Sequence, residues 1–220
     1  MAEIGLYEAL RTTRAVRRLR PDPVPEDALR RVLEAATWAP TGGNAQPWRV
    51  VAVRDPAKKA ELQALYAPLW DAYAAHHRRL LDGMPEEARG RQERMLRAAD
   101  HLARHLHEAP VILVFCFDPS AMAITDARQD RPSVVGGASV YPSVQNALLA
   151  CRAEGLGATL TTLLCGKEPE VKALLGIPAG WGTAACVPIG WPAGRGHGPL
   201  RRRPVEKIAF DDAWGQPFGT

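Results

Sequence analysis

The stretch Trp38-Ala-Pro-Thr-Gly-Gly-Asn-Ala-Gln-Pro-Trp-Arg-Val-Val-Ala-Val53 is the most informative part of this 220-residue chain. Its pattern predicts the end of a helix, then a glycine-rich turn, then a buried strand. Gly42 and Gly43 allow the backbone to take a positive φ or to approach a flat group closely. Asn44 and Gln46 each add an amide with two donors and one acceptor oxygen. These features are typical of a turn that holds a planar heterocycle with donors and acceptors along its rim, such as a flavin.

Hydrophobic spacing predicts a mixture of helices and strands around this turn. Residues 111–117 are apolar on both faces, as in a central strand. The other predicted strands cover residues 49–54, 158–163 and 183–189. The predicted helices cover a short segment with Leu6 and Leu10 on one face, and residues 26–36, 57–65, 140–154 and 169–175. Because the spacing does not force regular βαβ units, we predict an α+β fold.

Two further segments have a distinct character. Residues 68–107 have a helical pattern but are charged and poor in core residues, and they are interrupted at Asp82-Gly-Met-Pro85. We predict two exposed helices here, forming a helical lid or a partner-facing insert. From Trp191 onward the chain is rich in Gly, Pro and Arg and has no strong period. We therefore expect residues 192–220 to lie as an arm along a partner subunit.

Composition favours one globular domain over residues 1–220, with 46% hydrophobic and 24% charged residues. The longest apolar run is too short to span a bilayer, and no basic segment followed by an apolar one opens the chain. None of the four cysteines forms a CxxC pair, and Cys116 and Cys186 lie in apolar runs typical of small buried residues. We expect a reducing, cytoplasmic location and no membrane partner.

The chain is mildly basic, with a net charge of +4 and a pI near 9.0, and its arginines concentrate in residues 11–20 and 195–203. Neither run contains interleaved aromatics or a nucleic-acid-binding motif, so nucleic acid is not the expected partner. A phosphate on a small ligand explains clustered arginines as well as a solvated face does. Residues 14–18, 40–48 and 201–204 could together hold one phosphorylated aromatic ligand.

Several other catalytic patterns are weak. The glycines at 155–157 and 194–198 lack the strand-then-helix context of a dinucleotide fingerprint. His101 and His105 have zinc-binding spacing but lack the glutamate of a zincin, so a solvated helix face is favoured and no metal is expected. No serine has a nearby histidine–carboxylate arrangement, and neither Cys151 nor Cys165 has the neighbours of an activated thiolate.

Four motifs in order resemble the FMN-dependent nitroreductase family over nearly the whole chain. They are residues 14–25, residues 39–48, residues 143–157 with their Gln-Asn helix ending in Gly-Leu-Gly, and the closing pair 188–192 and 201–206. The resemblance implies a three-layer α/β/α sandwich around a mainly antiparallel sheet. It also implies an intertwined homodimer with two sites, each holding one FMN at the subunit interface. A C-terminal arm would wrap the partner.

The same resemblance assigns roles to individual residues. Arg14 would approach the phosphate and ribityl end of FMN. Arg17 would lie by the pyrimidine edge, where a cation stabilises the negative charge that reduction places at N1 and O2. The remaining cofactor contacts implied are Ala15, Pro40, Thr41, Gly42, Asn44, Gln46, Thr161, Thr162, Leu163, Arg201 and Arg202, with Arg203 as a further phosphate ligand.

Two positions depart from the family pattern. Ala15 stands where many members have a serine that contacts phosphate, and Leu19 replaces the usual aromatic residue. Because Ala15 lacks the serine hydroxyl, we expect either a lower affinity for FMN or a replacement phosphate contact from Thr13. Residues 68–107 match no family pattern, and since this region tends to set the substrate in the family, the substrate stays open.

The main functional hypothesis is an oxidoreductase that transfers hydride by a ping-pong mechanism. NADH or NADPH would reduce FMN at N5, leave, and be replaced by a nitroaromatic, quinone or enone. No side chain is required as an acid or base. The alternatives are other flavin chemistry (dehalogenation, dehydrogenation or flavin destruction) and a non-catalytic protein that sequesters FMN.

Overall fold

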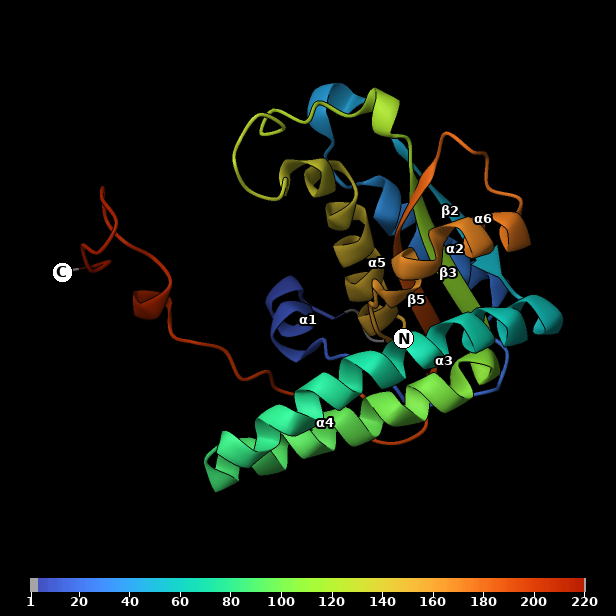
Figure 1. Cartoon of the computed structure of the whole chain (residues 1–220), viewed down its shortest axis with the longest axis horizontal. Helices are drawn as coiled ribbons and strands as arrows, with labels where there is room; N and C mark the ends of the chain where they lie inside the picture. The colour runs from blue at the N-terminus through green and yellow to red at the C-terminus, as the bar shows by residue number, and fades with distance from the viewer. Residues whose placement is uncertain (1–3, 220) are drawn as a thin grey trace.

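A five-stranded sheet lies between two layers of helices in the computed structural model, which describes residues 4–219 (Figure 1). The strands follow the order β1 (Leu19–Arg20), β5 (Gly182–Pro192), β3 (Val111–Phe117) and β2 (Trp48–Val53), and β4 (Gly157–Ala158) pairs with β5. All of these strand pairs are antiparallel. The predicted α+β class with a mainly antiparallel sheet is confirmed.

The central strand β3 divides the core into two halves. Successive side chains of a strand point to opposite faces of the sheet. Leu113 and Phe115 pack with α2 (Glu26–Thr37) and α5 (Tyr141–Ala153) on one face. On the other face, Ile112 and Val114 pack against α3 (Pro56–Arg79), α4 (Glu86–His105) and α6 (Glu168–Leu175). The two cores account for the three layers, and they confirm residues 111–117 as a central strand.

The two helices predicted over residues 68–107 are present, but the prediction that they are exposed is wrong for the part of the pair that lies on the sheet. Leu96 and Leu102 of α4 are each 3% exposed, and Trp70 of α3 is 4% exposed. Helix α3 also continues to Arg79 through Pro68, whereas the predicted helix stopped at residue 65. The buried residues of α3 recur about every four positions along one side of the helix. The other side carries many charged residues, so the average composition of the segment does not reveal the buried side. The sheet-facing part of the α3–α4 pair therefore belongs to the core, whereas residues 75–95 at its far end include no buried residue. The role of residues 68–107 as a lid or insert stays a prediction.

Two predicted strands differ from the structure. Residues 49–54 were expected to be buried, but β2 is the edge strand and only its last residue, Val53, is buried. Its β-branched residues suit a half-buried edge equally well. The predicted strand over 158–163 is reduced to β4 and one isolated bridge between Thr161 and Cys186. The intervening residues leave the ladder, and this departure opens the site described below.

Helix α1 (Leu6–Thr12) leaves its apolar side uncovered, since Leu6 is 65% and Leu10 is 43% exposed. The chain after β5 first packs on this same end of the molecule. The backbone N–H of Gly198 donates to Thr12 O over 3.1 Å, and that of Leu200 donates to Arg11 O over 3.0 Å. Beyond this contact the segment leaves the body (Figure 1). No helix within residues 4–219 combines the length and apolarity needed to cross a membrane.

Candidate functional site

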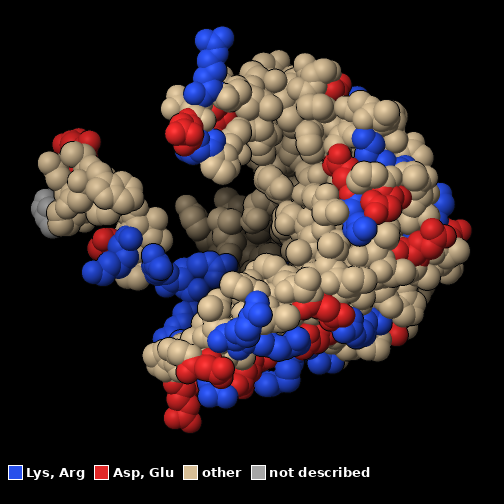
Figure 2. Space-filling model, viewed as in Figure 1, with Lys and Arg blue, Asp and Glu red and all other residues tan. Residues whose placement is uncertain are grey.

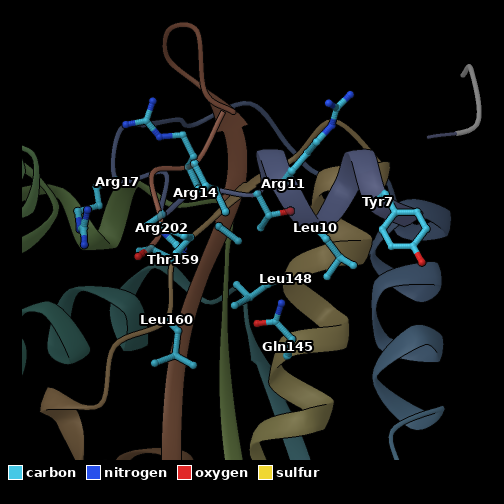
Figure 3. A pocket seen from close by; sticks show the side chains of 14 residues that line it. Tyr7, Leu10, Arg11, Arg14, Arg17, Gln145, Leu148, Thr159, Leu160 and Arg202 are labelled. Atoms are coloured by element: carbon cyan, nitrogen blue, oxygen red, sulfur yellow. The ribbon is translucent and has the colours of Figure 1, made fainter. Parts of the chain in front are cut away.

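A cavity of about 810 Å³ opens between α1, α5, β4 and the segment after β5 (Figure 3). Its volume is within the range of roughly 300–1,000 Å³ that is usual for small-molecule and cofactor sites. Its walls combine cationic and apolar side chains. They are formed by Tyr7, Leu10, Arg11, Thr13, Arg14, Ala15, Arg17, Gln145, Leu148, Ala158, Thr159, Leu160, Leu200 and Arg202. Four of the predicted contacts, Arg14, Ala15, Arg17 and Arg202, therefore meet in one cavity.

The chain after α1 is extended, so its successive side chains point alternately to opposite sides. Val16 is buried, and its backbone N–H donates to Ala158 O over 2.9 Å. Ala15 forms a parallel bridge with the same Ala158. Because neighbouring side chains of an extended segment alternate, Ala15 and Arg17 face the cavity while Val16 enters the core. A β-carbon on Gly157 would lie 2.7 Å from Val16 Cγ1, so this close approach requires glycine.

Arg17 lies where this cavity meets a smaller one of about 230 Å³. Burial lowers the pKa of its guanidinium, and the nearby Tyr66 opposes this shift only in part. No ion pair in the described part of the chain involves Arg17. A partly buried cation without a counter-ion is a site for an anion or for developing negative charge.

Arg14 and Arg202 reach the larger cavity from opposite ends of the chain (Figure 3). Neither forms an ion pair within residues 4–219, and Arg202 uses one nitrogen to donate to Arg201 O over 3.0 Å. Figure 2 shows blue Lys and Arg atoms gathered along the C-terminal segment where it leaves the body. Two guanidinium forks on one cavity can grip a phosphate in bidentate fashion.

Arg201 points elsewhere. Its Nη1 is 3.2 Å from Glu87 Oε1 near the start of α4, and both side chains are 78% exposed. Solvent and salt screen such an exposed pair, so a bound phosphate could compete with Glu87. The assignment of Arg201 to phosphate stays a prediction.

The smaller cavity contains the predicted segment Thr161, Thr162 and Leu163. Opposite this segment, α3 and α4 supply a largely aromatic and aliphatic wall made of Tyr66, Trp70, Tyr73, Met95, Ala99 and Leu102. Sequence reasoning did not identify these wall residues. The spacing of Tyr66 and Trp70, four residues apart on one helix, is the signal that could have indicated a shared face.

The glycine-rich turn has a specific shape but lines neither cavity of its own chain. Gly43, Asn44 and Gln46 all have positive φ, at 58°, 55° and 46°. Asn tolerates this region and Gln does so with strain, which often marks a functional site. The turn is braced internally, because Gln46 N donates to Thr41 Oγ1 over 3.0 Å and Gln46 Nε2 donates to Asn44 Oδ1 over 3.2 Å. Pro40 and Gly42 lie in the same turn and line neither cavity.

The remaining candidate groups have ordinary structural roles. The His101 and His105 rings stack 4.2 Å apart, and His105 Nδ1 lies 2.9 Å from Glu108 Oε1 on the surface of α4. Cys116 and Cys186 are buried, as predicted. Burial raises the pKa of Cys116 to about 11 and that of Cys186 to about 12, so neither is a thiolate nucleophile near neutral pH.

Comparison with known proteins places the chain in a family. The Nitroreductase family model matches residues 10–191. A protein called NADH dehydrogenase from Thermus thermophilus is 34% identical, spanning 90% of this chain and 91% of its own length. A 5,6-dimethylbenzimidazole synthase from Rhodospirillum rubrum is 33% identical, over 86% of this chain and 82% of its own. The solved structure of a putative nitroreductase in complex with FMN from Desulfovibrio desulfuricans has a TM-score of 0.62 at 25% identity, covering 97% of this chain and 99% of that one.

Proposed function

Because the chain belongs to the nitroreductase family, we propose that it is an FMN-dependent oxidoreductase that uses NADH or NADPH to reduce a small acceptor. When bound, FMN would accept a hydride from the nicotinamide and pass it to a nitroaromatic, quinone or enone in a ping-pong cycle. The observation that carries this proposal is the convergence of Arg14, Arg17 and Arg202 on one cavity.

The donor set of the cavity suits FMN. Arg14 and Arg202 would hold the phosphate, since neither has a counter-ion among the described residues and both present guanidinium forks. Leu148 and Leu160 supply apolar surface for a flat ring. Arg17 would place positive charge beside the pyrimidine edge, at the mouth of the second cavity. Thr161, Thr162 and Leu163 would offer backbone groups along another edge of the ring.

We further propose that a second copy of the chain completes the site. The turn over residues 40–46 carries the strained, polar geometry expected at a ligand but faces neither cavity of its own chain. In a homodimer the partner's turn would close over the ring. Exposed apolar side chains on α1 and along the C-terminal arm would be covered at the same time. They include Leu6, Tyr7, Ile208, Phe210, Trp214 and Phe218.

Another flavin chemistry is the second candidate, supported by the likeness to a 5,6-dimethylbenzimidazole synthase. A non-catalytic FMN-binding protein is the third. Either could use the same arginine cavity, so the cavity by itself does not separate them from a reductase. The four cysteines all carry free thiols, which supports a cytoplasmic location.

The test is to purify the full chain, load it with FMN and add NADH or NADPH without oxygen. We expect a yellow protein with one FMN per chain, which bleaches on addition of reductant and recolours with a quinone or nitroaromatic. A chain that takes up no FMN would contradict the proposal. If bound FMN stays yellow with either nucleotide, a sequestering role is favoured.

If the nucleotide bleaches the flavin but neither acceptor restores its colour, the reductase proposal would be replaced by another flavin chemistry. Anaerobic and aerobic runs with the same acceptors then separate oxygen-consuming chemistry from acceptor reduction. Inorganic phosphate serves as a competitor in the loading step, because it should weaken FMN uptake if the arginines bind the phosphate group.

A further inference from the structure

His197 lies where the segment after β5 crosses the end of α5. Its Nε2 is 2.8 Å from the carbonyl oxygen of Leu156, and since a carbonyl can only accept, Nε2 donates. Its Nδ1 is buried and has no hydrogen-bond partner among the described residues. This pattern fits a neutral imidazole with its proton on Nε2, because the orphaned Nδ1 is then an acceptor and not a buried donor.

The same crossing ties three elements together. Gly198 N donates to Thr12 O over 3.1 Å, which joins the segment to the end of α1. Arg152 of α5 donates from Nε to Thr12 Oγ1 over 3.0 Å. Leu200 N then donates to Arg11 O over 3.0 Å. We call residues 193–202 the strap. Among the described residues of the strap before residue 200, only His197 forms a side-chain hydrogen bond to the rest of the chain.

The strap places the arginines of the cavity. Arg14 follows Thr12 by two residues, and Arg202 follows Leu200 by two residues. A β-carbon on Gly198 would lie 4.0 Å from Arg14 Nη1, so the strap runs directly beside that guanidinium. Any shift of the strap at His197 would therefore move Arg202 relative to Arg14.

Resting on the proposed function, we propose that His197 is a positioning residue for the phosphate end of the site, that its bond to Leu156 O latches the strap, and that a proton on its orphaned Nδ1 weakens the latch. Protonation keeps the Nε2 donor in place but adds a buried N–H at Nδ1 that has no acceptor among the described residues, which destabilises the seated strap. Acidification would release the strap and weaken the hold on a phosphorylated ligand. The ring end of the site, formed by Arg17 and residues 159–163, would be unaffected.

Charge around the imidazole opposes its protonation. Protonated His197 would carry a second buried N–H with no acceptor within residues 4–219, next to Arg152 on α5 and with Arg14 beside the strap. Glu154 on the same end of α5 is already bound by Arg31. Burial lowers the pKa of His197, Arg152 lowers it further, and the bond to Leu156 O works in the opposite direction. Since the pKa falls on folding, the latch is fully present above the unfolded pKa and is lost as pH falls through the folded pKa.

The first test compares FMN and riboflavin, which lacks the phosphate, in wild type, His197→Phe and His197→Gln from about pH 8 to about pH 5. We expect His197→Phe to lose FMN affinity by roughly tenfold or more, with riboflavin affinity unchanged, because a displaced Arg202 would lose a charged hydrogen bond to the phosphate. His197→Gln keeps a donor that does not titrate. It should bind FMN like wild type at the higher pH and lack the acid-induced loss of affinity. His107→Gln changes an exposed histidine in the turn after α4 that lines neither cavity, so it is the matched control and should behave as wild type.

The second test needs no cofactor. Hydrogen exchange of the Gly198 and Leu200 amides, corrected for intrinsic rates, should lose protection on acidification in wild type and keep it in His197→Gln. Equal losses of FMN and riboflavin affinity in His197→Phe would overturn the proposal, as would unchanged amide protection. If wild type binds no FMN, the proposed function fails, and amide exchange still decides whether His197 latches the strap.

Discussion

Arg17 holds a positive charge in a place where burial disfavours it. It does so without a carboxylate partner in the described chain, whereas arginines elsewhere, such as Arg31 and Arg104, are engaged by acidic side chains. An uncompensated guanidinium costs free energy that the fold must offset elsewhere. Arg17 lines both cavities, where the proposed ligand would supply the missing negative charge.

Replacing Arg17 by methionine should change the redox property of the bound flavin more than its affinity. Without the cation beside the pyrimidine edge, we expect the two-electron midpoint potential to fall by roughly 30 mV or more, equivalent to about 1.4 kcal/mol. Arg18→Met is the matched control, because Arg18 lines neither cavity. Equal potentials in both variants, measured by anaerobic dye titration, would contradict the role given to Arg17.

The α3–α4 pair is a structural element and a site wall at once. One side packs on the sheet through residues such as Leu62 and Leu96, and another part of the pair lines the smaller cavity through Tyr66 and Trp70. Trp70 Nε1 also donates to Asp100 over 2.8 Å, which joins the two helices. A wall built into the core in this way cannot swing open without exposing apolar surface. Any gating motion is therefore expected at the exposed end of the pair, around residues 80–90.

Substitution of neighbouring residues in α4 tests this view of the pair. Leu96→Ala should lower the free energy of unfolding by about 2–5 kcal/mol, because it leaves a cavity in the core. Arg97→Ala changes an exposed side chain whose ion pair with Glu93 is long, at 3.9 Å, and should cost less than about 0.5 kcal/mol. Urea unfolding measures both values. A small effect of Leu96→Ala would instead support a detachable lid.

The two features proposed to bind a ligand, the arginine cavity and the turn over residues 40–46, lie apart in a single chain. The arginine cavity and the turn over residues 40–46 are both built in the monomer, yet the turn lines no wall of the cavity. The C-terminal arm extends from the body with apolar side chains exposed, Trp214 at 92% (Figure 1). Exposed apolar groups of this kind are typical of surfaces that bind another chain.

A mixed dimer tests whether the site is shared between chains. One variant carries Arg14→Ala with Arg202→Ala, and the other carries Thr41→Ala with Asn44→Ala. Each variant alone should bind FMN poorly, because every site in its homodimer lacks either the arginines or the turn. A heterodimer of the two restores one complete site, so we expect one FMN per dimer after co-expression with two purification tags. No recovery of binding would contradict a shared site.

Particular residues show how far prediction from sequence could reach. The helix before the turn and the central strand were predicted closely, because apolar periodicity and cap residues are local signals. The helix predicted over residues 140–154 is α5 (Tyr141–Ala153), and Gly155 just beyond its end has a φ of 73°. The burial of α3 and α4 was missed because Trp70 and Leu96 lie among charged residues, and only packing on the sheet selects their shared side. The exposure of β2 was missed because strand order depends on pairings distant in sequence.

The amino-acid sequence by itself determined the family, the α+β class, the glycine-rich turn and the arginines at both ends of the chain. Each of these depends on residue identity or short-range spacing. Only the tertiary structure decided that Arg14, Arg17 and Arg202 share a cavity, that Arg201 pairs with Glu87, and that His197 fastens the strap to Leu156. The physical reason is that these contacts join segments separated by long stretches of chain. Their geometry follows from the packing of helices on the sheet, which no local pattern encodes.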